Sequence, residues 1–429
     1  MHNLRGIRNS GFGLREGPSG PPNPGPSRTS VPDIVADFYE VLGKPRHNRS
    51  PKPTIMLVGL GDLSAAVLEL LAREGAVGQI VVCSRRAARG EARCNVVRMG
   101  AMAQGYEPSI RFVPLDINDA AAVAESVQRE APDLIFSAAS FQTWWLADLL
   151  PEQQAKDLKK ARFGVWLPVH LTLTLKLMQA LRDADYRGIT LTAPFPDVVN
   201  CVLGKLGLAP TCGVGNLDEI VPKVRQLAAE RLGAALNSID VMMVAHHALV
   251  PAAFGEPLEE LPPYYLRVYL EGRDVSGKVD APALLLAPCS LPPGPASCFL
   301  TAGSAVRLIR SLLSEDETYL HAPAPHGLPG GYPIIVRAGD VEPAPIEGLS
   351  LEEAIEINER SHRFDGVERI EADGTAVFCA QDVEVLRHTL GYQCERLKPE
   401  ESKGRAQELM ARFREYATRY GVDLQRQAR

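Results

Sequence analysis

The chain has little of several features that mark whole classes of protein. Its eight cysteines include no Cys-x-x-Cys pair, so the sequence indicates neither a zinc ribbon nor a disulfide framework. No apolar stretch reaches the roughly 18 residues that a membrane-spanning helix needs. Lysine and arginine number 46 against 52 acidic residues, a formal net charge of −6, so no basic excess points to nucleic acid. We therefore expect no nucleic-acid partner and no membrane partner.

The cysteines are scattered along the chain, which favours buried, reduced thiols in a cytoplasmic protein. They are Cys83, Cys94, Cys201, Cys212, Cys289, Cys298, Cys379 and Cys394. The N-terminus lacks the apolar core of a signal peptide, which agrees with a cytoplasmic location.

Composition divides the chain into three parts. Residues 1–50 begin with a stretch rich in glycine, proline, serine and arginine, which cannot bury enough apolar surface to order itself; one helix is possible at 31–44. The whole chain has 45% hydrophobic content, and the remainder is long enough for two domains with cores of their own. We expect a dinucleotide-binding domain over 51–197 and a substrate and assembly domain over 198–429.

The most informative pattern begins with an apolar run at 55–58. This run ends in Gly59-Leu-Gly61-Asp-Leu-Ser64, and an amphipathic helix pattern follows. A G-x-G-x-x-(G/A/S) turn between a strand and a helix is typical of dinucleotide binding. Gly59 would permit the tight turn, and Gly61 would let the backbone approach a pyrophosphate at the helix N-terminus. We place the pyrophosphate on Gly59, Gly61, Asp62, Leu63 and Ser64.

The end of the second apolar run, 79–83, bears on which dinucleotide binds. An acidic residue there would bind a ribose 2′-hydroxyl, but the sequence has Ser84-Arg85-Arg86 instead. Hydroxyl and guanidinium groups suit a 2′-phosphate, so the pattern predicts NADP as the cofactor.

Apolar runs continue to alternate with helix patterns as far as residue 192. Such alternation predicts an α/β fold with a parallel, doubly wound Rossmann sheet. The strands are expected at 55–58, 79–83, 110–114, 134–137 and 188–192, with helices at 63–74, 90–103, 120–130 and within 151–182. Ligands of such sheets lie at the carboxyl ends of the strands, which places Asp116 near the adenine side and Ala138 and Ala139 beside the nicotinamide ribose.

Beyond residue 197 the pattern becomes a mixed α+β one. Helices are expected at 198–207, 217–232, 304–314, 351–363 and from about 400, strands at 239–244, 264–271, 275–286, 334–337 and 367–378, and loops at 287–296 and 321–333. His321 and His326 are expected at the surface, and His170 is expected in the core.

Residues 54–250 resemble the lactate/malate dehydrogenase family. That family follows its fifth strand with N-P-V-D, then a G-x-G-x-x-L-D helix ending in E-R-L-G, then a strand that carries a catalytic histidine. Here the matching stretches are T-A-P-F-P-D at 192–197, G-V-G-N-L-D at 213–218, E-R-L-G at 230–233 and V-A-H-H-A at 244–248.

The resemblance implies a Rossmann domain followed by a mixed catalytic domain, usually in a homodimer or homotetramer. It implies a histidine that exchanges a proton with the substrate, and an aspartate that orients this histidine. The matching positions are Asp218 and either His246 or His247. Alternation along a strand puts the two histidines on opposite faces, so only one should face the site, and we expect His246.

Three departures from the family pattern bear on the substrate. Ala193 stands at the asparagine position, Val221 stands at the position of a carboxylate-binding arginine, and the loop at 141–145 contains no arginine. Lys223 and Arg225 are nearby but differ in helical phase. Since a bidentate contact to a carboxylate is strong, its loss predicts that 2-oxo acids are not reduced. The tryptophans at 144 and 145 indicate either a larger apolar substrate or interface packing.

The sequence thus predicts an NADP(H)-dependent oxidoreductase that acts on a small-molecule carbonyl, imine or alcohol other than a simple 2-hydroxy acid. Thr301, Ser304 and Arg307 are expected to contribute polar contacts near the substrate. Two alternatives stay open. One is a non-catalytic NADP-binding sensor or assembly protein, and the other is an NAD- and metal-dependent glycosidase-like enzyme that uses Cys201, Cys212 and a histidine. We expect no metal site.

Overall fold

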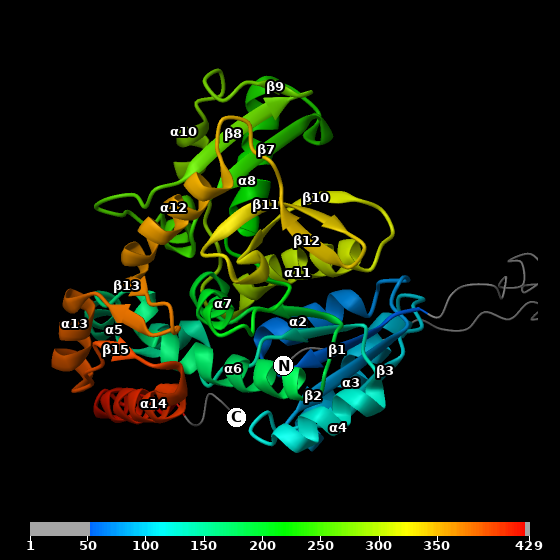
Figure 1. Ribbon diagram of the computed structural model, residues 1–429, viewed down its shortest axis with the longest axis vertical. Coiled ribbons are helices and arrows are strands. Elements are labelled where there is room, and N and C mark those ends of the chain that lie inside the picture. Colours follow the sequence, from blue (N-terminus) through cyan, green and yellow to red (C-terminus); the bar gives the residue numbers. More distant parts are fainter. Residues whose placement is uncertain (1–51, 425–429) are drawn as a thin grey trace, which may run out of the picture. The chain divides into compact units, whose positions relative to one another are not determined.

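The structure is a computed structural model that describes residues 52–424 (Figure 1). The expected N-terminal extension, with its possible helix at 31–44, lies outside the described residues. Among the described residues, no helix is both long and apolar enough to cross a membrane.

The first half forms a six-stranded parallel sheet with the order β3-β2-β1-β4-β5-β6. This confirms the predicted α/β class and doubly wound sheet. The strands are β1 (Thr54–Val58), β2 (Gln79–Ser84), β3 (Ile110–Pro114), β4 (Leu134–Ser137), β5 (Ile189–Thr192) and β6 (Cys212–Gly213). The sequence had indicated the first five; β6 is only two residues long and gives no periodic signal.

Helices cover both faces of the sheet because alternate strand residues point to opposite sides. On one side Ile55 and Leu57 pack with α2 (Asp62–Leu71) and α3 (Ala87–Met102). On the other side Met56 and Val58 pack with the remaining helices of this half. These are α4 (Ala120–Glu130), α5 (Glu152–Lys159) and α6 (Leu167–Asp183), joined by 3-10 turns η1 (Trp144–Leu149) and η2 (Phe163–Trp166).

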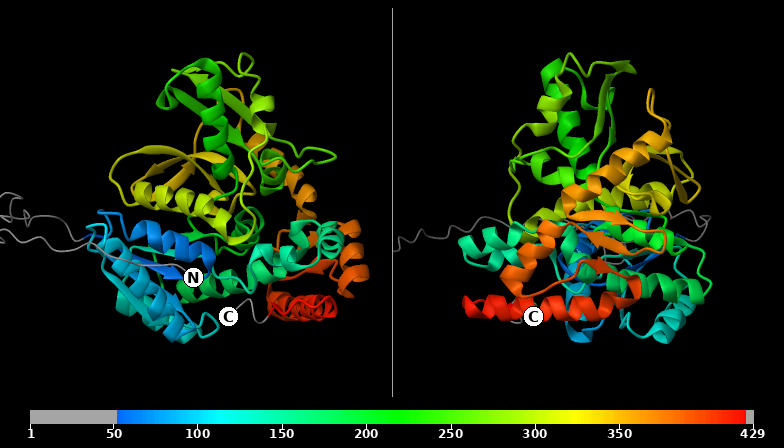
Figure 2. Two further views of the ribbon diagram at one scale, coloured as in Figure 1. Left: turned by 180° about the vertical axis from the view of Figure 1, so that it is seen from behind. Right: turned by 60° about the vertical axis from the view of Figure 1, so that its left-hand side comes forward.

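The second half contains three small antiparallel sheets and further helices (Figure 2). The first sheet consists of β7 (Ile239–Val244), β8 (Tyr265–Leu270) and β9 (Arg273–Asp274). The second consists of β10 (Thr318–Pro323), β11 (Gly331–Arg337) and β12 (Asp340–Pro343). The third consists of β13 (Val367–Ile370), β14 (Ala376–Phe378) and β15 (Arg396–Leu397). The helices are α7 (Pro196–Lys205), α8 (Leu217–Leu232), α9 (Val250–Ala253), α10 (Ala281–Leu286), α11 (Cys298–Leu312), α12 (Leu351–Ser361), α13 (Ala380–Leu390) and α14 (Ser402–Arg419), with 3-10 turns η4 (His247–Leu249), η6 (Pro325–Gly327) and η7 (His362–Asp365).

Two predictions for this half were wrong. The stretch 275–286 was expected as a strand, but the Asp280 side chain accepts a hydrogen bond from the Ala283 N–H and begins α10. The stretch 321–333 was expected as a loop because it is rich in proline, but its two ends are paired in β10 and β11. His321 is therefore a buried strand residue and not a surface one. Helix α13 was not predicted.

The C-terminal segment returns to the first half of the chain. Helix α14 packs along α6, where the Trp166 and Phe413 rings meet edge to face at 5.3 Å (Figures 1 and 2). One hydrophobic core accordingly contains residues of β1, α6, β14 and α14. Near this core, η7, far along the chain, lies against η4 and against Gly164 of η2. The division at residue 197 into a cofactor part and a substrate part remains our proposal for how the two stretches share the work.

Candidate active site

The turn between β1 and α2 has the geometry that a bound pyrophosphate needs. Gly59 adopts φ +87°, and a Cβ there would lie 3.0 Å from Ala139 at the end of β4. A Cβ on Gly61, by contrast, would meet no described atom within 4 Å. Gly61 precedes the first residue of α2, and no described side chain caps that helix. Free N–H groups and open space therefore meet where an anion would bind.

Ser64 and Asp62 complete the environment of this turn. Ser64 is fully buried, and its Oγ has no hydrogen-bond partner among the described residues. The Asp62 carboxylate accepts a hydrogen bond of 3.3 Å from Nε1 of Trp145, so the loop after β4 reaches back to the turn. An open approach at Gly61 and an orphaned hydroxyl one turn later fit a dinucleotide.

The carboxyl end of β2 is positively charged at its surface. Ser84 ends the strand, and Arg85 and Arg86 follow it as exposed residues, with Arg86 at the N-terminus of α3. The pKa of Asp116 is lowered, first by the Asn118 backbone N–H and also by the positive charge of Arg85. The structure thus brings together Arg85 and Asp116, which the sequence placed on two neighbouring strands.

The two adjacent histidines, His246 and His247, follow the end of strand β7, and their side chains differ in solvent exposure. His246 is 0% exposed, and both ring nitrogens are engaged: Nδ1 accepts from the Ala248 N–H at 3.2 Å, and Nε2 lies 3.0 Å from Nδ1 of His362. The His247 side chain keeps 22% of its surface exposed. The geometry therefore favours His247 over His246, the residue that we expected to face the site.

The carboxylate that contacts His247 comes from an unexpected part of the chain. Nδ1 of His247 is 2.7 Å from Oδ2 of Asp365, at the end of η7. Asp218 does not pair with either histidine. Its carboxylate accepts from Ser304 Oγ at 2.6 Å and forms an ion pair with Arg307, because the side chain on α8 faces α11. The predicted Asp218–histidine pairing is thus wrong. Ser304 and Arg307 contact Asp218, and their predicted contact with the substrate stays a prediction.

Surrounding carboxylates control the charge of His247. Burial alone would lower its pKa, but Asp365, together with Asp197 and Glu219, raises the pKa to about 9. Burial would raise the pKa of Asp365, but the two histidines hold it far below its usual range. An imidazolium and a carboxylate therefore face each other at neutral pH. The Asp197 side chain also accepts the backbone N–H of His247, which fixes the end of the strand.

Glu219 is a second carboxyl group of this region. It accepts a hydrogen bond of 2.6 Å from the Thr301 hydroxyl on α11. Burial raises its pKa to about 7, opposed by the Thr301 hydrogen bond and by the charge of His247. Glu219 was not singled out in the sequence, although it directly follows the L-D motif.

Aromatic rings enclose His247. The rings of Phe163 and Phe195 each lie 5.2 Å from its imidazole and meet each other edge to face at 4.9 Å. Behind them, His170 is buried as expected, with its ring 5.0 Å from that of Phe163. Burial, followed by the charge of His247, lowers the pKa of His170 to about 3, so this ring is neutral. The His247 imidazolium thus has apolar walls.

Neither Lys223 nor Arg225 takes over the role of the missing carboxylate-binding arginine. Val221 is buried within α8. Lys223 donates to the backbone carbonyl oxygens of Ala253, of Leu285 at 2.6 Å and of Ala287 at 2.9 Å. Arg225 donates to the Leu236 carbonyl at 3.0 Å. Both basic groups are therefore engaged with the backbone.

The structure gives no support to a metal centre at this place. Within residues 52–424, no three His, Cys, Asp or Glu side chains are arranged to hold an ion. Cys201 lies near Lys205 and Glu359, and burial raises its thiol pKa to about 12. Cys212 is influenced by Asp340, and burial raises its pKa still further. Neither thiol joins His247.

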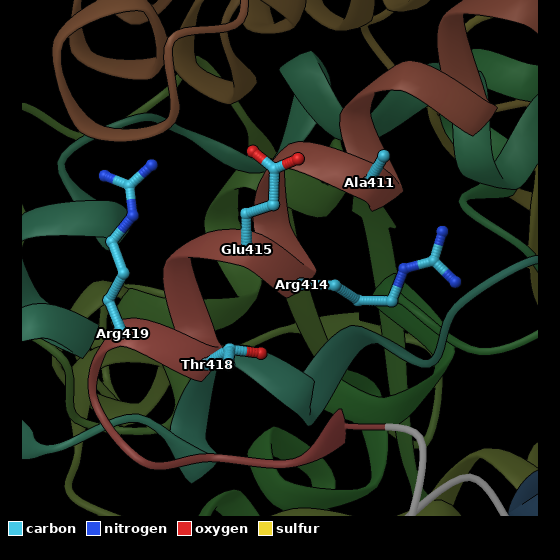
Figure 3. A pocket seen from close by; sticks show the side chains of 5 residues that line it. All are labelled: Ala411, Arg414, Glu415, Thr418 and Arg419. Carbon is cyan, nitrogen blue, oxygen red and sulfur yellow. The ribbon is translucent and has the colours of Figure 1, made fainter.

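A hollow on the outer side of α14 is separate from this site (Figure 3). Its lining comes from a single helix and shares no residue with the histidine site. The lining residues are Ala411, Arg414, Glu415, Thr418 and Arg419. We assign no function to it.

Comparison with known proteins shows what this arrangement resembles. No protein-family model and no curated protein sequence matches the chain. Solved structures do match: a malate dehydrogenase from Cryptosporidium parvum has a TM-score of 0.52 at 12% identity and covers 73% of this chain and 96% of its own. A lactate dehydrogenase from Eimeria maxima, solved with NADH and oxamate, has a TM-score of 0.50 at 13% identity, with 74% and 93% covered.

A malate dehydrogenase from Plasmodium falciparum in complex with NADH gives the same picture, with a TM-score of 0.50 at 13% identity, covering 72% of this chain and 95% of its own. At identities this low, the structural match establishes the architecture, and the reaction has to be argued from the side chains of the site. The chain therefore has the fold of the lactate/malate dehydrogenases, a Rossmann sheet followed by a mixed α+β half.

Proposed function

We propose that this protein is an NADP(H)-dependent oxidoreductase that transfers a hydride to or from a carbonyl, imine or alcohol. The observation that carries the proposal is His247, a partly exposed imidazolium that is hydrogen-bonded to Asp365 and lies in a chain with a dehydrogenase fold. The solved structures of similar fold include dehydrogenases crystallised with NADH, which supports a nicotinamide cofactor.

When bound, the cofactor supplies or accepts the hydride; the chain supplies the proton. Because Nδ1 of His247 is held by Asp365, Nε2 is the ring nitrogen left for the substrate. In the reducing direction Nε2–H donates its proton to the substrate oxygen or nitrogen, where negative charge would otherwise develop. Phe163 and Phe195 restrict water around the imidazolium, which strengthens that electrostatic interaction.

Two further features support a preference for NADP. Arg85 and Arg86 are exposed at the end of β2, where a 2′-phosphate would lie. Arg86 also precedes the first turn of α3, whose free N–H groups would favour an anion. We infer that these groups contact the 2′-phosphate, and that the turn from Gly59 to Ser64 binds the pyrophosphate.

The substrate is proposed to differ from a simple 2-hydroxy acid. A substrate carboxylate needs a charge-assisted partner when it leaves water. Arg307, however, is paired with Asp218, and Lys223 and Arg225 donate to backbone carbonyls. The aromatic walls instead favour a substrate with an apolar body.

We also propose that the protein is a cytoplasmic homodimer or homotetramer that acts on small molecules. An exposed apolar stripe on α3 supports self-association, since such surfaces are commonly covered by a partner. The stripe consists of Val96, Met99 and Met102.

The test is NADPH and NADH binding by calorimetry, followed by turnover with a panel of aldehydes, ketones, imines and 2-oxo acids. We expect tighter NADPH binding, and turnover of apolar carbonyl or imine compounds but not of pyruvate or oxaloacetate. Equal binding of both dinucleotides would contradict the arginine assignment. Tight NADPH binding without turnover of any class would favour the sensor, which the missing carboxylate-binding arginine also favours. Metal-dependent cleavage of glycosides, abolished by a chelator, would favour the glycosidase-like alternative.

A further inference from the structure

The short turn η7 brings two side chains to the buried side of the histidine pair. Asp365 and His362 lie 118 and 116 residues after His247 and His246, respectively. The four side chains form one connected group: Asp365 Oδ2 is 2.7 Å from Nδ1 of His247 and 3.3 Å from Nδ1 of His246, and His246 Nε2 is 3.0 Å from Nδ1 of His362. The family motif contains nothing at this position.

Hydrogen-bonding roles within the group follow from its charge. An ionised Asp365 can only accept, so His247 must carry a proton on Nδ1. The other ring nitrogen, Nε2, is then the one that exchanges protons with a substrate. His246 and His362 meet edge to face, with ring centroids 4.9 Å apart, and Nδ1 of His246 lies 3.3 Å from Asp365 Oδ2.

The turn η7 packs against residues 162–164, the segment that contains Phe163. A Cβ on Gly164 would lie 2.5 Å from the Asp365 carbonyl oxygen, so only glycine allows this close approach. Nε of Arg162 donates to the fully buried Asp382 at 3.0 Å, and its Nη1 donates to the Arg363 carbonyl at 2.6 Å. The orientation of Asp365 and the position of Phe163 are therefore set by the same contacts.

We propose that Asp365 is the positioning carboxylate that fixes the tautomer and orientation of His247, in place of Asp218. This assignment rests on the proposed function of His247 in proton transfer. Other titratable groups face His247, but Asp365 is the one that hydrogen-bonds its ring among the described residues. The others are Asp197, which accepts the backbone N–H, Glu219, which accepts from Thr301, and His170 and His246.

The first test titrates His247 in the resting protein by NMR of isotope-labelled histidine, with its signal assigned by loss in His247→Gln. Removing the Asp365 charge with Asp365→Asn should lower the His247 pKa by about 1–3. The matched control is Asp218→Asn, another buried aspartate, which should leave that pKa nearly unchanged because its carboxylate pairs with Arg307. An unchanged pKa in Asp365→Asn, or a larger fall in Asp218→Asn, would overturn the proposal.

A second test uses the carbonyl compound that wild type turns over best. We expect kcat in Asp365→Asn to fall by about 10²–10⁴-fold with little change in KM, as expected when a proton donor is held in the wrong tautomer. Asp365→Glu should recover part of this loss. Equal kcat in Asp365→Asn and wild type would contradict the assignment. Should no compound be turned over, the proposed function fails, while the NMR titration still decides the role of Asp365; should Asp365→Asn not fold, Asp365→Glu is titrated in its place.

Discussion

The two ends of the candidate site are built in different ways. The cofactor end consists of one continuous stretch, from the turn at Gly59 to Arg86, in which each residue acts through its own backbone or its exposed side chain. The proton-transfer end is assembled from segments that lie far apart: Phe163, His247 and Asp365 meet only after the C-terminal helices pack on α6. A continuous turn can keep its geometry when the rest of the chain changes, whereas an assembled site can exchange its carboxylate for one from another segment.

The same contrast decides what the sequence could predict. The strand–turn–helix pattern indicated β1 to β5, and the two histidines were found through the resemblance of residues 244–248 to the family's histidine-bearing strand. Glycine spacing carries geometric information locally, as the left-handed Gly59 and the open approach at Gly61 show.

Asp365 and Asp218 show why the remainder could not be predicted. Asp218 stands at the motif position, but α8 presents it to Ser304 and Arg307, whose side chains contact its carboxylate instead of a histidine. Asp365 lies in a short turn with no motif around it, and only tertiary packing brings it to His247. The buried His321 was missed for a related reason, because Pro333 opposite it reads as a loop residue but is accommodated in β11.

The largest expected effect separates the two histidines. His247→Gln removes the proton donor and should lower kcat by about 10²–10⁴-fold, while NADPH affinity changes little. His246→Gln should cause a smaller loss, because the His246 ring is buried and cannot reach a substrate. Steady-state NADPH oxidation with the best carbonyl compound measures both. Full turnover in both variants would remove the catalytic assignment altogether.

The proton-transfer end also depends on an ion pair that does not itself contact His247, the pair of Arg162 with Asp382. Arg162→Ala removes the guanidinium from the buried Asp382, which keeps only the backbone N–H of residue 162 from this segment, and should destabilise the protein by about 3 kcal/mol. Arg182→Ala is the control: its pair with Asp183 is exposed, so its loss should cost less than about 1 kcal/mol. Urea unfolding measures both. Equal effects of the two substitutions would mean that η7 is not fixed by Arg162.

The cofactor end can be blocked without disturbing the fold. Gly61→Val places a side chain in the open approach to α2, and each phosphate hydrogen bond lost should cost about 1.5–3 kcal/mol of binding. Gly75→Val, likewise open but outside the turn, should leave binding unchanged. Calorimetry with NADPH and thermal unfolding without it compare the variants. If both bound NADPH like wild type, the pyrophosphate site would lie elsewhere.

The preference for NADP should depend on the arginines after β2. Arg85→Ser and Arg86→Ser should each lower the NADPH-to-NADH affinity ratio by about tenfold, equivalent to 1.4 kcal/mol. Arg93→Ser, on the exposed side of α3, controls for the loss of one positive charge. An unchanged ratio in both variants, measured by calorimetry, would leave the preference without a structural basis.

A further effect concerns stability at alkaline pH. The pKa of His247 is about 9 in the folded protein, above the roughly 6.5 of an unfolded histidine. Its contribution to stability is therefore complete below pH 6.5 and is lost as the pH rises through about 9. Unfolding free energies at pH 6 and pH 10 should differ less in His247→Gln than in wild type. An identical difference in both would show that the carboxylates do not raise this pKa.

The most direct test of the account is an experimental structure with NADPH bound. We expect the pyrophosphate at Gly61 and the N-terminus of α2, the 2′-phosphate at Arg85 and Arg86, and C4 of the nicotinamide facing a space bordered by His247 Nε2. A nicotinamide ring that lies away from His247, or a pyrophosphate bound elsewhere than at Gly61, would contradict it.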